Sequence, residues 1–207
     1  MNMNANWQRC NIQTFWGDIA PCSHVVQIYE NQEVLLNLLE GFVAGGITVG
    51  DCVIVIATAD NLEALRERLV SHGLDVEALE ARDQYMALDA DQTLAKFMVN
   101  DWPDYHLFMH TMNTLFERAH QKHKKVRAFG EMVALLWAQG KSGATVMLEH
   151  LWNTFSEKEQ FPLLCAYPES GFAQDTQSAI RNICSTHSKM VTGWEKSKTE
   201  ISYLDIS

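Results

Sequence analysis

Five apolar runs of strand length alternate along the chain with segments in which apolar residues have a helical spacing. The clearest run, residues 52–58 (CVIVIAT), is β-branched and lacks polar alternation, as in a parallel strand buried on both faces. The same signals predict strands at residues 24–29, 84–90, 125–131 and 161–168. Strands that alternate with helices imply a mostly parallel central sheet flanked by helices on both faces. The pattern therefore predicts a single α/β domain.

The segments between these strands carry helix signals. Apolar residues recur at helical spacing from Val34 to Val43. Asp60 to Glu63 has the form of a capping box that would open the next helix, and Pro103 suits the first turn of a helix over 103–120. Further helices are predicted at residues 90–100, 132–140, 143–155 and 174–190.

The predicted elements define one domain over residues 22–190, with extensions over 1–21 and 191–207. The N-terminal extension lacks the continuous apolar region of a signal peptide. Of 207 residues, 47% are hydrophobic, which is enough for one compact core. Five cysteines, an odd number, fit a reducing compartment better than a disulfide framework. We therefore expect a cytoplasmic protein.

The net charge limits the classes of partner. It is −10, from 26 acidic and 16 basic residues. Nucleic acids and anionic membranes both require a basic face, so neither is expected as a partner. The apolar runs are also much shorter than a membrane span.

The ends of the predicted strands indicate where a ligand would bind, because open parallel sheets bind ligands at the carboxyl ends of their strands. Those ends carry Tyr29 with Glu30, Thr58, Glu131 and Tyr167. The edge is acidic and aromatic, and the turn after the first strand has neither glycine nor lysine. A triphosphate would meet like charge there.

Several blocks of the sequence resemble the MEDS family of sensory domains: HVVQIYE, CVIVIAT, RAFGEMVALLWAQG, LEHLWN, LLCAYP and ICSTH. The resemblance spans roughly residues 22–190. It implies a domain that senses small hydrocarbon-derived molecules and is often joined to a histidine kinase or a DNA-binding module. No segment of this chain has the length of either output domain.

The order of elements from His24 to Leu88 also resembles the core of RecA/KaiC-type ATPases, which implies a three-layer sandwich. In those ATPases a phosphate-binding loop follows the first strand, where this chain has residues 30–33, Glu-Asn-Gln-Glu. Asp60 stands where a pair of catalytic acids is expected, and Glu131 is the nearest match to the magnesium-binding acid. These residues are too few to position a nucleotide, a metal and a water together. We therefore predict a scaffold without hydrolase activity and without a cofactor.

Seven residues are candidates for ligand binding, and all except Thr58 have a structural alternative. The two glutamates precede helices, where a carboxylate gains about 0.3–1 kcal/mol from the helix dipole. The tyrosines and tryptophans are equally suited to bury their rings in the core and to form the apolar wall of a pocket. The candidates are Tyr29, Glu30, Thr58, Glu131, Trp137, Trp152 and Tyr167.

Cysteine and histidine give weaker signals. Cys184 and His187 are about one helical turn apart, which is enough for an activated thiolate or for half of a metal site. Histidine pairs at helical spacing elsewhere lack the third and fourth ligands that a metal site needs. Cys52 and Cys165 lie inside predicted strands and are interpreted as core thiols. No metal site is predicted.

Two hypotheses of function follow. The first is a signal-input domain that binds a small, largely apolar ligand in the crevice above the sheet and relays binding to a regulator. The alternative is an interaction module that docks to a separate histidine kinase or transcription regulator without a metabolite. Residual nucleotide binding is a third reading, and a homo-oligomer is compatible with each because RecA-like domains often self-associate. Aromatic residues in the two extensions favour docking: Trp7, Phe15, Trp16, Trp194 and Tyr203.

Overall fold

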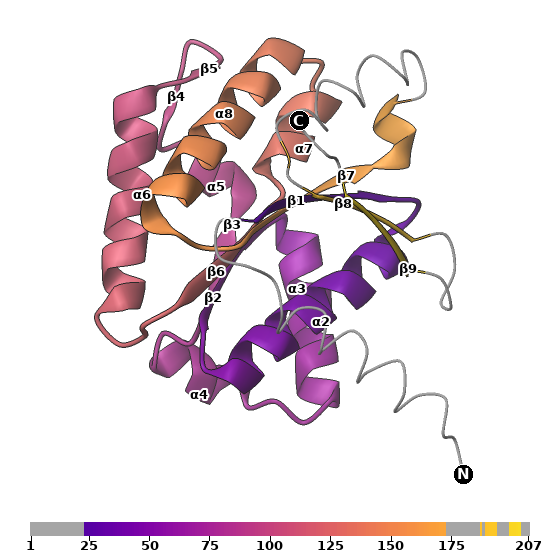
Figure 1. Cartoon of the computed structure of the whole chain (residues 1–207), viewed down its shortest axis with the longest axis vertical. Helices are drawn as coiled ribbons and strands as arrows, with labels where there is room; N and C mark the ends of the chain where they lie inside the picture. The colour runs from indigo at the N-terminus through magenta and orange to yellow at the C-terminus, as the bar shows by residue number, and fades with distance from the viewer. Residues whose placement is uncertain (1–22, 173–186, 188, 194–198, 204–207) are drawn as a thin grey trace.

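The computed structural model describes residues 23–172, 187, 189–193 and 199–203, and its centre is a seven-stranded sheet (Figure 1). The strand order is β3-β2-β6-β7-β1-β8-β9, and all neighbours are parallel except β8 and β9. The strands are β1 (His24–Tyr29), β2 (Cys52–Ala57), β3 (Tyr85–Asp89), β6 (Val126–Gly130), β7 (Leu163–Pro168), β8 (Lys189–Gly193) and β9 (Thr199–Tyr203). A separate hairpin consists of β4 (Met98–Val99) and β5 (Trp102–Pro103).

Helices cover both faces of the sheet (Figure 1), which confirms the predicted three-layer α/β class. One face carries α2 (Gln32–Val49), α3 (Ala59–Ser71) and α4 (Val76–Ala81). The other carries α5 (Ala90–Leu94), α6 (Tyr105–His120), α7 (Met132–Ala138) and α8 (Ser142–Glu159). A 3-10 turn, η1 (Glu169–Phe172), follows β7.

Two apolar cores lie on opposite faces of the sheet because side chains alternate along each strand. In β2, Ile54 and Ile56 contact the core under α5–α8, whereas Val53 and Val55 contact the core under α2–α4. Every residue of β2 is buried. The strand predicted from an apolar run without polar alternation is therefore confirmed.

Helix α2 approaches the sheet closely at Gly46. A Cβ atom on Gly46 would lie 2.5 Å from Cγ2 of Val53 and 2.7 Å from Cδ of Arg127, so a larger residue would displace both. Arg127 is itself buried in β6, and its Nε and Nη2 donate to Oδ2 of Asp51 at 2.9 and 2.6 Å. This buried ion pair joins β6 to the residue that precedes β2.

Two predicted helix starts are wrong by one or two residues. Asp60 does not open its helix, because α3 begins one residue earlier with Thr58 as the N-cap. Pro103 lies in β5, and α6 begins after Asp104, whose carboxylate accepts from the backbone N–H of Leu107 at 2.9 Å. A capping carboxylate satisfies a backbone donor, which proline in the first turn does not.

The structure also differs from the predicted elements near the hairpin and at the C-terminus. The helix predicted at 90–100 ends at Leu94, and β4 follows. Most of the helix predicted at 174–190 lies outside the described residues, but positions 189 and 190 belong to β8. Strands β8 and β9 carry the sheet into the predicted extension 191–207. The division into one domain and two extensions stays a prediction.

Candidate functional site

The carboxyl edge of the sheet holds a hydrogen-bonded network centred on Glu131, which follows β6 directly. Its Oε2 accepts from the backbone N–H of Thr58 at 2.9 Å, and its Oε1 accepts from Nδ2 of Asn61 at 2.7 Å. Oδ1 of Asn61 in turn accepts from Nε2 of Gln32 at 2.9 Å. The network therefore connects the end of β6 to the first turns of α3 and α2.

Glu131 is buried and also affects Tyr29 at the end of β1. Burial, and secondarily the negative charge of Glu131, raises the pKa of the Tyr29 hydroxyl above its usual value. Tyr29, Thr58 and Glu131 thus gather at one edge of the sheet. Glu30 is adjacent in sequence to Tyr29 but exposed to solvent.

The turn between β1 and α2 is too short to surround a phosphate. Only Glu30 and Asn31 separate the strand from the helix. Oδ1 of Asn31 accepts from the backbone N–H of Val34 at 3.1 Å, and so the chain itself occupies one of the donors that a helix N-terminus would offer to an anion. Glu33 in the first turn of α2 adds a further negative charge.

The two candidate tryptophans lie in different surroundings. Trp137 on α7 is partly buried, and its Nε1 donates to the carbonyl oxygen of Gly171 in η1 at 2.8 Å, beyond the carboxyl end of β7. Trp152 on α8 is fully buried, with its ring edge-to-face against Phe108 at a centroid distance of 5.2 Å. Trp152 therefore lies in the core between α8 and α6 rather than with Trp137.

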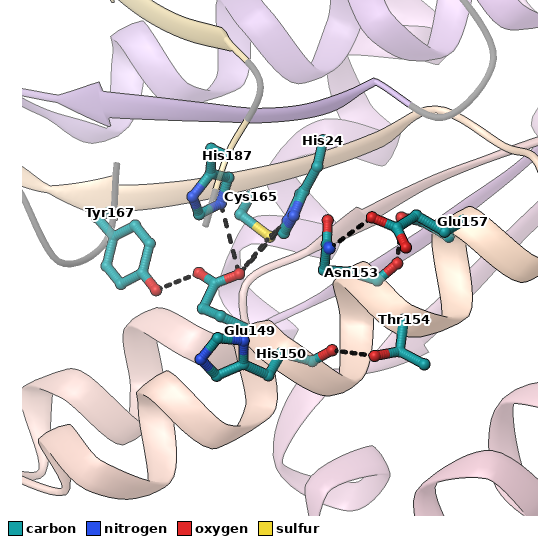
Figure 2. Close-up of polar contacts among 10 residues, drawn as sticks. His24, Glu149, His150, Asn153, Thr154, Glu157, Cys165, Tyr167 and His187 are labelled. Atoms are coloured by element: carbon teal, nitrogen blue, oxygen red, sulfur yellow. Dashed lines mark hydrogen bonds and ion pairs between the residues drawn. The ribbon is translucent and has the colours of Figure 1, made fainter. Parts of the chain in front are cut away.

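Tyr167 turns away from the edge and toward α8. Its hydroxyl donates a short hydrogen bond to Oε1 of Glu149, and both side chains are buried (Figure 2). Because residues two apart on a strand share a face, Tyr167 lies on the same side of β7 as Cys165. The sequence-predicted site residues are therefore not all brought together. Tyr29, Thr58 and Glu131 lie at the carboxyl edge of the sheet, whereas Tyr167 contacts a second, interior group.

The interior group is a cluster of four donor side chains, His24, Glu149, Cys165 and His187 (Figure 2). Nε2 of His24 lies 3.3 Å from Sγ of Cys165 and 3.4 Å from Oε2 of Glu149. Nε2 of His187 lies 3.4 Å from the same Oε2, and the two imidazole rings are 4.0 Å apart between centroids. We refer to these four residues as the buried cluster.

Four segments of the chain supply the buried cluster. His24 begins β1, Cys165 lies within β7, Glu149 lies on α8, and His187 lies two residues before β8. All four residues are at most 1% exposed. Burial and the neighbouring Glu149 carboxylate raise the pKa of the Cys165 thiol well above its usual value.

Sequence reasoning missed most of this cluster. Glu149 was not a candidate, Cys165 was interpreted only as a core thiol, and His187 was paired with Cys184, which lies outside the described residues. One signal was present in the sequence. Glu149 shares the buried side of α8 with Leu148 and Trp152, where an ionisable residue needs a partner.

The fold of this chain is similar to those of two solved archaeal structures, one of which is a KaiC-like protein. The Pyrococcus horikoshii OT3 protein PH0250 superimposes with a TM-score of 0.61 at 13% identity, covering 92% of this chain and 90% of that one. The KaiC-like protein PH0186 from the same organism superimposes with a TM-score of 0.57 at 10% identity, covering 87% and 77%. At such identities the likeness shows the fold alone.

The chain belongs to the MEDS family, the methanogen/methylotroph, DcmR sensory domain, whose family model matches residues 23–188. The family is one of sensory domains, and this membership indicates a role in signal input. None of the curated proteins matches the chain. In the described part of the chain, no helix has both the length and the apolar character needed to cross a membrane.

Proposed function

We propose that this chain is a non-catalytic signal-input domain that binds a small, largely apolar ligand at the carboxyl edge of the sheet and relays binding to a histidine kinase or transcription regulator. The observation that carries the proposal is the Glu131 network. It holds the first turns of α2 and α3 against the end of β6 through a single chain of hydrogen bonds. A ligand that binds more tightly to one arrangement of these hydrogen bonds than to another would shift the populations of the two arrangements.

The chemistry of the edge supports sensing over hydrolysis. Phosphoryl transfer needs a phosphate-binding loop, a metal-holding acid and a positioned water at once. Here the turn at Glu30 and Asn31 is short and acidic, and both carboxylate oxygens of Glu131 already accept hydrogen bonds from the protein. These features favour a ligand without phosphate groups and a domain without catalytic activity.

Five of the candidate residues remain in the proposed ligand site. Glu131 and Tyr29 would orient the ligand, Thr58 and Glu30 would complete the polar side, and Trp137 would contribute apolar surface. Trp152 and Tyr167, which are both fully buried, would be reached only if α8 moved away from the sheet.

The first test is a thermal-shift panel on the purified chain, with chlorinated and aromatic hydrocarbons, alcohols, amines and magnesium-ATP. A ligand present at about 100 times its Kd adds about 2.7 kcal/mol to the free energy of unfolding, which raises the midpoint measurably. A rise with one chemical class supports the proposal and names the ligand class. A rise with magnesium-ATP alone contradicts it and supports residual nucleotide binding.

The site assignment is tested with variants of the edge. The double variant Glu131→Gln/Tyr29→Phe should lose the shift caused by the active ligand, whereas Tyr105→Phe, an exposed tyrosine on α6, should keep it. An unchanged shift in the double variant would place the ligand elsewhere.

A docking module is the second candidate, and one observation favours it. Four large apolar side chains that are 41–49% exposed lie close together in sequence around β4, β5 and the start of α6: Val99, Trp102, Tyr105 and Leu107. If this surface binds a histidine kinase or regulator, Trp102→Gln should abolish a stoichiometric complex that Glu131→Gln leaves intact. A monomeric chain that forms no such complex, measured by light scattering, would count against docking.

A further inference from the structure

The buried cluster has the composition of a metal site rather than of an ordinary core. It contains two imidazoles, one carboxylate and one thiol, and their donor atoms all lie within 4.8 Å of one another. Ionisable side chains are seldom fully buried unless they are paired or bind a metal. Four donors that converge on one point therefore require an explanation beyond packing.

Four of the six distances between donor atoms lie at or close to the edges of a tetrahedron around one ion, and all six are within 4.8 Å. Zinc bonds of about 2.0–2.1 Å to nitrogen or oxygen and about 2.3 Å to sulfur give tetrahedral edges of about 3.3–3.6 Å. In the buried cluster these distances are 3.3 Å from His24 Nε2 to Cys165 Sγ, 3.4 Å from each imidazole Nε2 to Glu149 Oε2, and 3.8 Å from Cys165 Sγ to that oxygen. In both histidines the nitrogen near Oε2 of Glu149 is Nε2.

A hydrogen bond from outside the cluster fixes the orientation of the Glu149 carboxylate. The Tyr167 hydroxyl donates to Oε1 of Glu149, so that Oε2 is directed at His24 and His187 (Figure 2). Metal-ligating carboxylates are characteristically hydrogen-bonded in this way, which fixes their orientation. Tyr167 thus has the position of a group that orients a metal ligand.

We propose that His24, Glu149, Cys165 and His187 together bind one divalent transition-metal ion, with zinc the best match. Imidazole and thiolate donors suit zinc, whereas magnesium and calcium prefer sites made of oxygen. A dication also balances the charges of one thiolate and one carboxylate, both of which belong to buried residues. Four protein donors leave no open coordination position, which is the arrangement of structural zinc sites.

The metal site would connect the segment at His187, near the end of the region that matches the family model, to the rest of the fold. His187 lies two residues before β8, which pairs in parallel with β1. The other three ligands come from β1, β7 and α8. Metal binding would therefore fasten the start of β8 to the sheet and to α8, independently of any ligand at the Glu131 network.

The experiment measures metal content and cobalt spectra on the full-length chain. Purified protein should contain about one zinc per chain by elemental analysis. After removal of the metal with a chelator, Co²⁺ should bind with a thiolate-to-cobalt charge-transfer band and the intense visible bands of tetrahedral cobalt. Cys165→Ser should lose the charge-transfer band, whereas Cys52→Ser, which removes the other described buried cysteine, should retain it.

Two further variants keep the test decisive if Cys165→Ser does not fold, as judged by circular dichroism. Tyr167→Phe removes one hydroxyl and should weaken metal binding by about 10- to 100-fold, the typical effect of losing a hydrogen bond to a ligand. Cys184→Ser should leave the cobalt spectrum unchanged. Absence of both zinc and a cobalt spectrum in the folded chain would overturn the proposal. A charge-transfer band that depends on Cys184 instead of Cys165 would overturn it as well.

Discussion

Replacing Glu131 by alanine should destabilise the fold more than replacing it by glutamine, because alanine removes the acceptor of two hydrogen bonds and glutamine keeps one acceptor oxygen. Alanine leaves the Thr58 N–H and the Asn61 amide without their acceptor. A hydrogen bond to a charged group contributes about 1.5–3 kcal/mol. Two such bonds give a loss of about 3–6 kcal/mol, toward the lower end because Thr58 is only half-buried.

Glutamine keeps one acceptor oxygen for Thr58 but places an amide NH2 opposite the amide donor of Asn61. The conflict disappears if Asn61 turns its side-chain amide over and Gln32, its exposed partner, does the same. Only the charge is then lost, and the expected cost falls to about 1–2 kcal/mol.

The measurement is equilibrium unfolding in urea for the wild type and the two Glu131 variants, with the slope against urea checked for constancy. The alanine variant should lose at least about 1 kcal/mol more than the glutamine variant. Equal losses would mean that Asn61 and Gln32 do not rearrange. A loss below about 1 kcal/mol for alanine would mean that the network contributes little to the fold.

Two further predictions concern charged residues away from the edge. Asp51→Ala should cost about 3–5 kcal/mol in urea unfolding because Arg127 is left buried without its carboxylate, and Asp51→Leu/Arg127→Leu should recover part of that loss. Hydrogen bonds from Lys122 and Arg118 lower the pKa of Asp83, so its stabilisation is complete above the unfolded pKa of about 3.9 and is lost as pH falls through the lower native pKa. Asp83→Asn keeps a residue type tolerated at its φ of 56°, and its stability deficit relative to wild type should be full at neutral pH and vanish in acid. A deficit that persists unchanged in acid would show that the charge of Asp83 is not its cause.

The edge of the sheet was predictable because its position depends only on the order of strands. Parallel strands place their carboxyl ends together, and this brought Tyr29, Thr58 and Glu131 into one region without knowledge of any contact. The contacts within that region were not predictable. Asn61 bridges Glu131 and Gln32 because α2 and α3 lie side by side, which no local pattern encodes.

The buried cluster was not predictable because its members are far apart in the sequence. His24 and Cys165 are 141 positions apart, and only the pairing of β1 with β7 brings them together. The position of Tyr167 relative to Cys165 was predictable, because their spacing of two puts both side chains on one face of β7. Only the structure shows that this face lies under α8.

The pairing of β8 with β1 also determines which C-terminal truncations of the chain should still fold and remain soluble. A fragment ending at residue 188, where the family match ends, would lack β8 and leave one side of β1 without its hydrogen-bonding partner. Exposed strand edges of this kind pair readily with other chains and cause aggregation. A soluble recombinant fragment should therefore extend at least through β9, whose antiparallel pairing with β8 completes the sheet at that side.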